Sequence, residues 1–404
     1  MTGGDAGGGA RRWHEGSGPP RVRRLILLGS TGSIGTQTIE VLSNLNALHA
    51  QGLAGTRYEV VGLAAGRNAD ALFAQAAALG VRDVAVCEAG RVDAPSGLNV
   101  RRGEDACERL VREVECDVVL GAVVGFAGLA ATLAAVEQGR DVALANKETL
   151  VAAGAIVVDA ARKSGSRLLP VDSEHSAVWQ CLPDLAPPCR YGPEVARVVL
   201  TASGGPFRNA SAREVYDATP EMALAHPTWS MGAKVTIDSA SLTNKALELI
   251  EAHWLFGLES ARLDAVVHPQ SIVHSFVEFA DGSVLAQCGA PDMRTPIQYA
   301  LTHPERPRGC SNRIDWATLG RLDFEPVDHE RFPALRVAHE VIRSGGDGAT
   351  TAGAVFNGAN EAAVGAFLRG EIAFGRITEL AQEALSRVGV SGWRGLGDGV
   401  EADG

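Results

Sequence analysis

Short apolar runs alternate with segments of helical period through the first 150 residues. Apolar runs of strand length predict strands at 25–28, 59–63, 84–86, 118–124 and 142–144. Apolar residues recur every three or four positions at 34–45 and 69–79, which predicts helices there. Repeated strand–helix–strand units favour a parallel sheet with right-handed crossovers. The pattern therefore predicts an α/β fold that begins with a doubly wound, Rossmann-like domain over residues 23–150.

The pattern is mixed from residue 151 to about residue 290. Strand-like runs at 168–171, 197–201, 265–267, 272–279 and 284–287 are interspersed with helical segments. Asp281-Gly282, between two apolar runs, is typical of a β-hairpin. We predict a central α+β domain over 151–290, whose sheet could cover a site or build a dimer.

The other segments differ in character. Residues 291–315 are rich in proline and charge, which predicts one short helix and then a linker. Helical patterns at 334–343, 352–368 and 377–385 predict a small helical bundle as a C-terminal domain over 316–395. Residues 1–22 are rich in Gly, Arg and Pro, so we predict a disordered tail and not a secretory signal. Residues 46–57 are expected to form a surface loop.

One apolar stretch, Val118 to Val136, is long enough to span a membrane. Gly121, Gly125 and Gly128 interrupt it, and another apolar run follows at once. We interpret it as a buried strand, a tight turn and a packed helix, and we predict no membrane association.

Composition limits the classes of function. The chain has 404 residues, 46% of them hydrophobic, which is enough for more than one domain with a core. A formal net charge of −11 argues against a general nucleic-acid binder. The seven cysteines include no CxxC pair, which favours a reducing, cytoplasmic location without disulfide framework or zinc site.

A glycine-rich loop, Gly29-Ser-Thr-Gly32-Ser-Ile-Gly35, follows the first predicted strand and begins the first helix. Glycines let a backbone approach a pyrophosphate, and the helix N-terminus offers free N–H groups to it. The spacing GxxGxxG is less specific than GxGxxG. The alternative is a glycine turn in an α/β protein that binds something else.

The end of the second strand bears on the cofactor. NAD sites usually carry an acid there, whereas this chain has Gly66-Arg67-Asn68. Arg67 could pair with a 2′-phosphate, which favours NADPH. The alternative is a surface arginine.

Asn146-Lys147-Glu148 follows the fifth predicted strand. Ligands of open α/β sheets bind beyond the carboxyl ends of strands, so nicotinamide and substrate would meet at this triplet. Lys147 could bind a substrate oxygen or assist proton transfer. Lys147 and Glu148 could instead simply begin a helix.

Three carboxylates form a candidate metal site. Asp172 and Glu174 follow an apolar run interpreted as a strand, and alternate residues of a strand share a face. Glu248 lies one helical turn from both Asn244 and Lys245. Oxygen ligands of this kind suit a hard divalent ion. The alternative for each segment is surface acids and a helix cap.

Hydroxyl, amide and ammonium groups near these acids could bind a phosphorylated substrate. Ser203 is followed by two glycines, and Ser239, Asn244 and Lys245 supply further donors. A loop from His226 through Trp229 to Gly232 could close over the ligand and exclude water. A lone histidine is more often structural than catalytic, so the loop is weak evidence by itself.

These segments, in this order, resemble the 1-deoxy-D-xylulose 5-phosphate reductoisomerase family from about Arg24 to Val390. The motifs that carry the resemblance are GSTGSIG, ANKE, PVDSEHSA, TASGGPFR, HPTWSMG-K, DSASLTNKALE, HPQSIVHS and PDMRTPIQYA. The resemblance implies a homodimer and an enzyme of the methylerythritol phosphate pathway to isoprenoid precursors. This sequence departs from the family pattern at position 67, where it has arginine and many relatives have lysine.

The resemblance also implies roles for individual residues. The NADPH contacts would be Thr31, Gly32, Ser33, Ile34, Gly66, Arg67, Asn68, Asn146, Glu148 and Gly232. The ligands of Mg²⁺, Mn²⁺ or Co²⁺ would be Asp172, Glu174 and Glu248, in the domain 151–290. The substrate would contact Lys147, Ser173, Glu174, Ser203, His226, Trp229, Ser239, Asn244, Lys245 and Glu248. The catalytic set would be Lys147, Asp172, Glu174, His226 and Glu248.

The implied reaction is a skeletal rearrangement of the sugar phosphate, followed by reduction to 2-C-methyl-D-erythritol 4-phosphate. The metal would act as a Lewis acid, and hydride would come from NADPH. Whether the rearrangement is retro-aldol/aldol or a ketol shift stays open.

Three rival hypotheses remain. Another NADPH-dependent sugar-phosphate oxidoreductase would need no metal, and a non-enzymatic NADPH-binding protein would not need the three carboxylates. A metal-dependent isomerase without redox chemistry would not need the glycine loop.

Overall fold

A computed structural model describes residues 21–87, 93–182, 185–229, 231–345, 350–388 and 390–392. The predicted tail lies outside these residues except for Arg21 and Val22, which already belong to the first strand. Among the described residues, no helix is both long and apolar enough to cross a membrane.

The N-terminal half of the chain is built on a seven-stranded parallel sheet with the order β4-β3-β2-β1-β5-β6-β7. Its strands are β1 (Arg21–Leu28), β2 (Thr56–Ala65), β3 (Asp83–Val86), β4 (Asn99–Arg102), β5 (Val118–Gly121), β6 (Asp141–Leu144) and β7 (Leu168–Pro170). The strand order reverses between β1 and β5, which confirms the doubly wound α/β prediction. Only β4 had no predicted counterpart.

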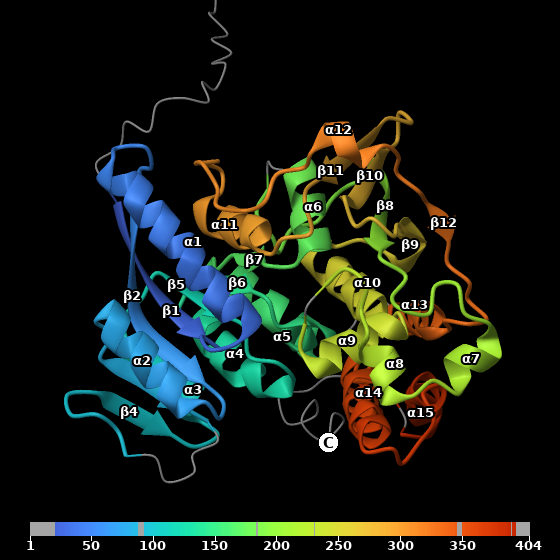
Figure 1. Ribbon diagram of the computed structural model, residues 1–404, viewed down its shortest axis with the longest axis horizontal. Coiled ribbons are helices and arrows are strands. Elements are labelled where there is room, and N and C mark those ends of the chain that lie inside the picture. The colour runs from blue at the N-terminus through green and yellow to red at the C-terminus, as the bar shows by residue number, and fades with distance from the viewer. Residues whose placement is uncertain are drawn as a thin grey trace, which may run out of the picture.

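Helices cover both faces of this sheet (Figure 1). They are α1 (Ser33–Ala50), α2 (Ala69–Leu79), α3 (Ala106–Glu113), α4 (Leu129–Glu137) and α5 (Lys147–Ser164), with the 3₁₀ turn η1 (Phe126–Gly128) before α4. The interpretation of 118–136 as strand, turn and helix is thereby confirmed. The predicted loop 46–57 is wrong in part, because α1 continues to Ala50 through Leu48, whose burial favours another helical turn.

A second sheet of five strands has the order β11-β10-β8-β9-β12. Its strands are β8 (Val195–Ala202), β9 (Leu263–Val267), β10 (Val273–Phe279), β11 (Val284–Cys288) and β12 (Glu325–Pro326). The predicted hairpin at Asp281-Gly282 joins β10 to β11 as an antiparallel pair. Helix α6 (Ser173–Cys181) packs on β10 and β11, and α10 (Thr243–Phe256) contacts β8 and β9.

Further helices connect and support the two sheets. They are α7 (Ala212–Tyr216), α8 (Pro220–Leu224), α9 (Ala233–Ala240), α11 (Arg294–Thr302) and α12 (Trp316–Leu319), with the 3₁₀ turn η2 (Ser260–Arg262) before β9. Helix α11, inside the predicted linker 291–315, packs beside α1 and against β6 and β7.

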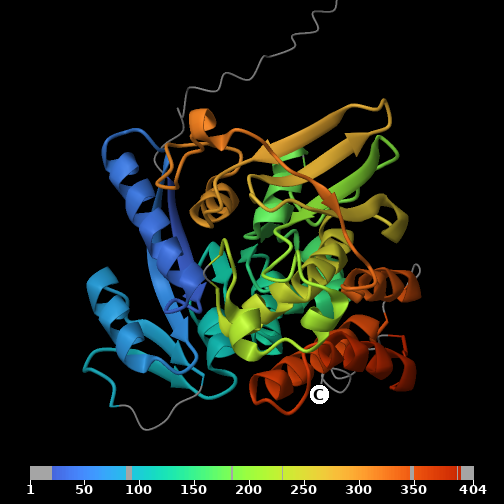
Figure 2. The ribbon, with the colours of Figure 1, turned by 45° about the vertical axis from the view of Figure 1, so that its right-hand side comes forward.

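The C-terminal helices are α13 (Ala334–Gly345), α14 (Ala352–Leu368) and α15 (Arg376–Arg387). They lie together at one end of the molecule, in red in Figure 2. Helix α14 contacts α5 and α9 as well as α13 and α15. Most of its surface is therefore buried between these helices.

Candidate active site

A cavity of about 580 Å³ lies beyond the carboxyl ends of the parallel strands, bordered by α9 and α10. This is where an open α/β sheet usually binds its ligand. The predicted residues that line it are Gly32, Ser33, Ile34, Asn146, Lys147, Glu148, Asp172, Ser173, Glu174, Ser203, Trp229, Gly232, Ser239, Asn244, Lys245 and Glu248. The structure thus brings the glycine loop, the acids and the phosphate-binding candidates to one cavity.

The glycine loop is shaped by close backbone contacts. A Cβ on Gly29, whose φ is +81°, would lie 2.4 Å from the carbonyl oxygen of Ala122, and one on Gly35 would lie 2.3 Å from that of Gly29. Gly32 caps α1 without a side-chain hydrogen bond, so the N–H groups of the first turn can face a ligand. These features fit a pyrophosphate at the N-terminus of α1.

The residues predicted to bind the 2′-phosphate of NADPH lie at the end of β2 and do not line the cavity. Gly29 and Ser30 donate their backbone N–H groups to the carbonyl oxygen of Ala64, at 2.9 and 2.8 Å, so the glycine loop borders this strand end. Gly66, Arg67 and Asn68 follow directly; Thr31, in the loop itself, also does not line the cavity. The Oδ1 atom of Asn68 accepts from the backbone N–H of Ala71 at 3.2 Å and caps α2.

Asn146 connects two segments of the cavity wall. Its Oδ1 atom accepts from the backbone N–H of Thr149 at 2.8 Å and caps α5, while its Nδ2 atom donates to the carbonyl oxygens of Val123 and Gly125. The side chain is buried. These bonds position the loop after β5 against the start of α5, beside the predicted nicotinamide position.

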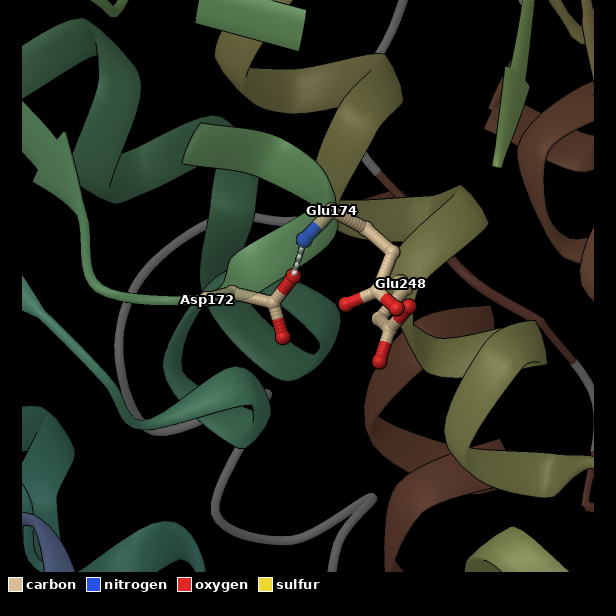
Figure 3. A group of neighbouring side chains, drawn as sticks. All are labelled: Asp172, Glu174 and Glu248. Atoms are coloured by element: carbon tan, nitrogen blue, oxygen red, sulfur yellow. Dashed lines mark hydrogen bonds between the residues drawn. The ribbon is translucent and has the colours of Figure 1, made fainter. Parts of the chain in front are cut away.

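Asp172, Glu174 and Glu248 point toward a common space (Figure 3). One carboxylate oxygen of each lies within 4.8 Å of the others. The predicted reason for the Asp172–Glu174 pair was wrong, because the strand ends at Pro170. Asp172 is instead the N-cap of α6, accepting from the backbone N–H groups of Glu174 and His175 at 3.0 and 3.1 Å, and Glu174 lies in the first turn.

Two lysines neutralise part of this negative charge. Lys147 donates to Asp172 and lies 3.4 Å from an oxygen of Glu248. Lys245 donates to Glu248 and lies 3.3 Å from an oxygen of Glu174. The Nδ2 atom of Asn244 donates to Glu248 at 2.5 Å, so the predicted one-turn spacing on α10 is confirmed.

The charges shift the pKa values of the acids in opposite directions. Burial opposes ionisation of Asp172, but the attraction of Lys147, His175 and Lys245 outweighs it and holds the pKa of Asp172 well below its usual range. Burial raises the pKa of Glu174 to about 8; Lys245 opposes this rise, while Glu248 and Asp172 add to it. The three acids are therefore crowded beyond what the lysines neutralise, and this donor set fits a divalent cation.

A histidine joins the two serines predicted to bind phosphate. The Nε2 atom of His226 lies 3.1 Å from the hydroxyl oxygens of both Ser203 and Ser239. Its Nδ1 atom accepts from the backbone N–H groups of Thr228 and Trp229, at 3.1 and 2.9 Å. The neutral ring therefore carries its proton on Nε2 and donates toward the serines. Burial lowers the pKa of His226, which favours this neutral form.

His226 itself does not line the cavity, whereas Trp229 and Gly232 of the same loop do. Ser230 lies outside the described residues, and the predicted closure of the loop over a ligand stays a prediction.

The sequence analysis missed several buried or partly buried polar residues around the site. His175 lies between the acids: its Nε2 atom is 2.8 Å from the backbone oxygen of Glu248, and its Nδ1 atom is 3.4 Å from Asp172. Lys234 and Asp238 line the cavity beside Glu148, and Arg294, paired with Asp292, lines it from α11. Their motifs were recognised, but no local pattern showed that these side chains face the cavity.

The doubly wound sheet, the nucleotide loop and the adjoining carboxylates together define a class, the metal-dependent nucleotide-binding oxidoreductases. Family models refine this class. The model described as 1-deoxy-D-xylulose 5-phosphate reductoisomerase matches residues 25–154, and two C-terminal-domain models of the same enzyme match 168–256 and 288–403. The chain belongs to the 1-deoxy-D-xylulose 5-phosphate reductoisomerase family.

Individual relatives are similar in sequence to this chain over nearly its whole length. The 1-deoxy-D-xylulose 5-phosphate reductoisomerase of Pelotomaculum thermopropionicum is 46% identical over 395 residues, covering 95% of this chain and 96% of the relative. That of Mycobacterium avium is 49% identical over 370 residues, covering 91% and 86%.

Solved structures of the family have the same fold. The Zymomonas mobilis enzyme in complex with NADPH has a TM-score of 0.81 at 39% identity, covering 95% of this chain and 96% of that one. A DOX-P reductoisomerase in complex with NADPH, fosmidomycin and magnesium has a TM-score of 0.79 at 35% identity, covering 90% and 89%.

Proposed function

We propose that this chain converts 1-deoxy-D-xylulose 5-phosphate to 2-C-methyl-D-erythritol 4-phosphate, with NADPH and a divalent metal ion, in the methylerythritol phosphate pathway of isoprenoid precursor synthesis. The observation that carries the proposal is one cavity lined by both the nucleotide loop and the three carboxylates, in a chain of this family. Neither an oxidoreductase without metal nor a non-enzymatic NADPH-binding protein accounts for the carboxylates.

The metal would be held by Asp172, Glu174 and Glu248. A bound Mg²⁺, Mn²⁺ or Co²⁺ ion supplies a Lewis acid to the ketone and hydroxyl oxygens of the substrate, and bound NADPH supplies the hydride. Lys147 lies between Asp172 and Glu248, so its ammonium group would lie beside the substrate oxygens and could bind one of them or assist proton transfer. Ser173, whose hydroxyl donates to Glu174 at 2.6 Å, is the remaining substrate contact on this side.

The substrate phosphate would bind Ser203, Ser239, Asn244 and Lys245. The Nε2–H group of His226 faces the lone pairs of the two serine hydroxyls, which leaves the hydroxyl protons to be donated to an anion. Trp229 would cover the substrate carbon chain and exclude water from the reacting atoms. Binding energy from the phosphate, remote from the reacting carbons, would then stabilise the closed arrangement.

The direct test is NADPH oxidation with 1-deoxy-D-xylulose 5-phosphate and Mn²⁺, with and without excess chelator. We expect turnover that chelation abolishes and added Mn²⁺ restores. Turnover that survives chelation would contradict the role of the carboxylates. NADPH binding without turnover would contradict the substrate.

The NADPH preference would depend on Arg67, together with Gly66 and Asn68. Arg67→Met is expected to raise the Kd for NADPH by about 10- to 100-fold and that for NADH by less than about twofold, because only NADPH has the 2′-phosphate. Fluorescence titration of both nucleotides measures this difference. An equal loss for the two would show that Arg67 acts on the loop and not on the phosphate.

We further propose that the protein is a homodimer in which the β11 edges of two copies meet. Strand β11 is the edge of the second sheet, and Val284 and Leu285 on it are 52% and 49% exposed. An exposed apolar edge strand favours pairing with another strand, and a second copy offers a matching one.

Leu285→Lys is expected to shift the protein from dimer to monomer, because it places a charge in the proposed interface. Light scattering after size exclusion measures the mass. Leu53→Lys, at a 65% exposed apolar position in the loop after α1, is the matched control and should leave the mass unchanged. A monomeric wild-type chain, or a dimeric Leu285→Lys variant, would contradict the interface.

We also propose a cytoplasmic location. We keep the division into domains at 23–150, 151–290 and 316–395 except at two strands: β7 pairs with β6 and belongs to the N-terminal sheet, and β12 pairs with β9 and belongs to the second sheet. The seven cysteines are all free thiols, which supports a reducing compartment.

A further inference from the structure

A chain of polar contacts connects the C-terminal helix α14 with the cofactor side of the cavity. The Nδ2 atom of Asn360 on α14 donates to Oδ1 of Asp238 at 2.9 Å. The other oxygen of Asp238, Oδ2, lies 3.0 Å from the ammonium of Lys234 on α9. Lys234 also donates to Oε1 of Glu148, in the first turn of α5, at 2.6 Å. Helices α14 and α5, from distant parts of the chain, are therefore linked through the Asp238–Lys234 pair on α9.

The contacts are protected from water. Asn360 and Asp238 are each 1% exposed and Glu148 is 4% exposed, and the Lys234 side chain is 18% exposed. Exposed ion pairs are loosely held, but removal of one partner from a buried pair leaves an uncompensated charge. The orientation of the Glu148 carboxylate is therefore tied to Lys234 and Asp238.

The position of Asn360 is fixed by close helix packing. A Cβ on Gly353 of α14 would lie 1.9 Å from the carbonyl oxygen of Val151 on α5, so the two backbones touch. Asn360 follows Gly353 by about two helical turns and thus lies near the same face of α14. Val151 is one turn beyond Lys147, so α14 is held against the end of α5 that carries Lys147 and Glu148.

The charges around Glu148 favour its anionic form. Burial opposes ionisation of Glu148, but the ammonium groups of Lys234 and Lys147 outweigh it and lower its pKa. Burial likewise opposes the charge of Lys234, and Asp238 and Glu148 raise the pKa of Lys234 above its usual value. An ionised carboxylate only accepts hydrogen bonds, so its partner in a ligand must be a donor.

We propose that Lys234, Asp238 and Asn360 are positioning residues that hold the Glu148 carboxylate toward the hydroxyl donors of the nicotinamide riboside of NADPH. Lys234 donates to Oε1 of Glu148, and no other side chain of the described residues is hydrogen-bonded to this carboxylate, so Oε2 can accept from a ribose hydroxyl. Glu148 follows β6, on the side of the strand-order reversal away from Arg67 and hence away from the adenosine half. The inference rests on the proposed function, which assigns Glu148 to NADPH.

The test is nucleotide binding to the full chain, measured by fluorescence without substrate. Lys234→Met is expected to raise the Kd for NADPH about tenfold, and Asn360→Leu by about three- to tenfold. Adenosine 2′,5′-bisphosphate lacks the nicotinamide riboside, so displacement titration should find its Kd unchanged in both variants. Lys234→Arg, which keeps the charge, should recover most of the NADPH affinity.

A control variant and a double variant distinguish the loss of Glu148 positioning from a general disturbance of the fold. Lys163→Met removes an exposed ion pair with Asp159 on the same helix α5 and should leave both affinities unchanged. Adding Lys234→Met to Glu148→Gln should cost little further affinity, since both act through one carboxylate.

Two results would overturn the inference alone: an unchanged NADPH Kd in Lys234→Met, or an equal loss for NADPH and adenosine 2′,5′-bisphosphate. Failure of the wild-type chain to bind NADPH would instead overturn the proposed function, and with it this inference.

Discussion

Glu248→Gln is expected to lower kcat/KM about 1000-fold while the Kd for NADPH changes by less than about twofold. Glu248 is 1% exposed and is one of the three carboxylates that would hold the metal. Its replacement by a neutral amide leaves Lys245 and Lys147 with less opposing charge and removes an anionic ligand. A loss of about 4 kcal/mol of transition-state stabilisation corresponds to this factor.

Two measurements separate the metal from the cofactor in this variant. Free Mn²⁺ measured by electron paramagnetic resonance should show weakened binding to Glu248→Gln, and fluorescence should show normal NADPH binding. Glu371→Gln, at an exposed pair with Arg369, is the control and should behave as wild type. Full activity of Glu248→Gln would remove the metal assignment.

Gly35→Ala is expected to raise the Kd for NADPH at least about 100-fold and to lower the melting temperature. The new Cβ would lie 2.3 Å from the carbonyl oxygen of Gly29 and 2.5 Å from Cα of Ser30, and both neighbours are backbone atoms. These backbone atoms can move away from the new Cβ only if the whole loop moves, which would lower the free energy of unfolding by about 1–3 kcal/mol. The pyrophosphate contacts at the start of α1 would then be displaced.

The control for this prediction is Gly345→Ala at the end of α13. Among the described residues, no heavy atom lies within 4 Å of the Cβ it would add, and the φ of Gly345 is not in the left-handed region. Calorimetry and NADPH titration should find Gly345→Ala close to wild type. Wild-type affinity in Gly35→Ala would show that the loop does not approach the pyrophosphate.

Local patterns were sufficient where chemistry depends on neighbours in the sequence. The loop from Gly29 to Gly35 was recognised because strand, glycines and helix follow one another directly. The approach of Asn244 and Lys245 to Glu248 was predicted because the helical repeat alone brings such residues together. The alternation of strands and helices likewise predicted the parallel sheet.

Prediction was weaker at the boundary between a strand and the helix that follows it. The run 167–171 was extended into Asp172 and Glu174, since alternation alone cannot locate the end of a strand. The side chain of Asp172 instead accepts two backbone N–H groups and begins α6. The two acids still meet, because an N-cap and the first turn of a helix lie close together.

The sequence by itself determined the class of fold, the nucleotide loop and the approach of Asn244 and Lys245 to Glu248, because these depend on patterns among residues a few positions apart. The meeting of Glu248 with Asp172 and Glu174 needed the tertiary structure, because these acids lie in distant parts of the chain. Only the tertiary structure decided which side chains support the site. Asn360 and Asp238 are 122 positions apart, and Lys234 and Glu148 are 86 apart. Such pairs form only when α14, α9 and α5 pack together, and no periodicity along the chain specifies which side chains meet at that junction.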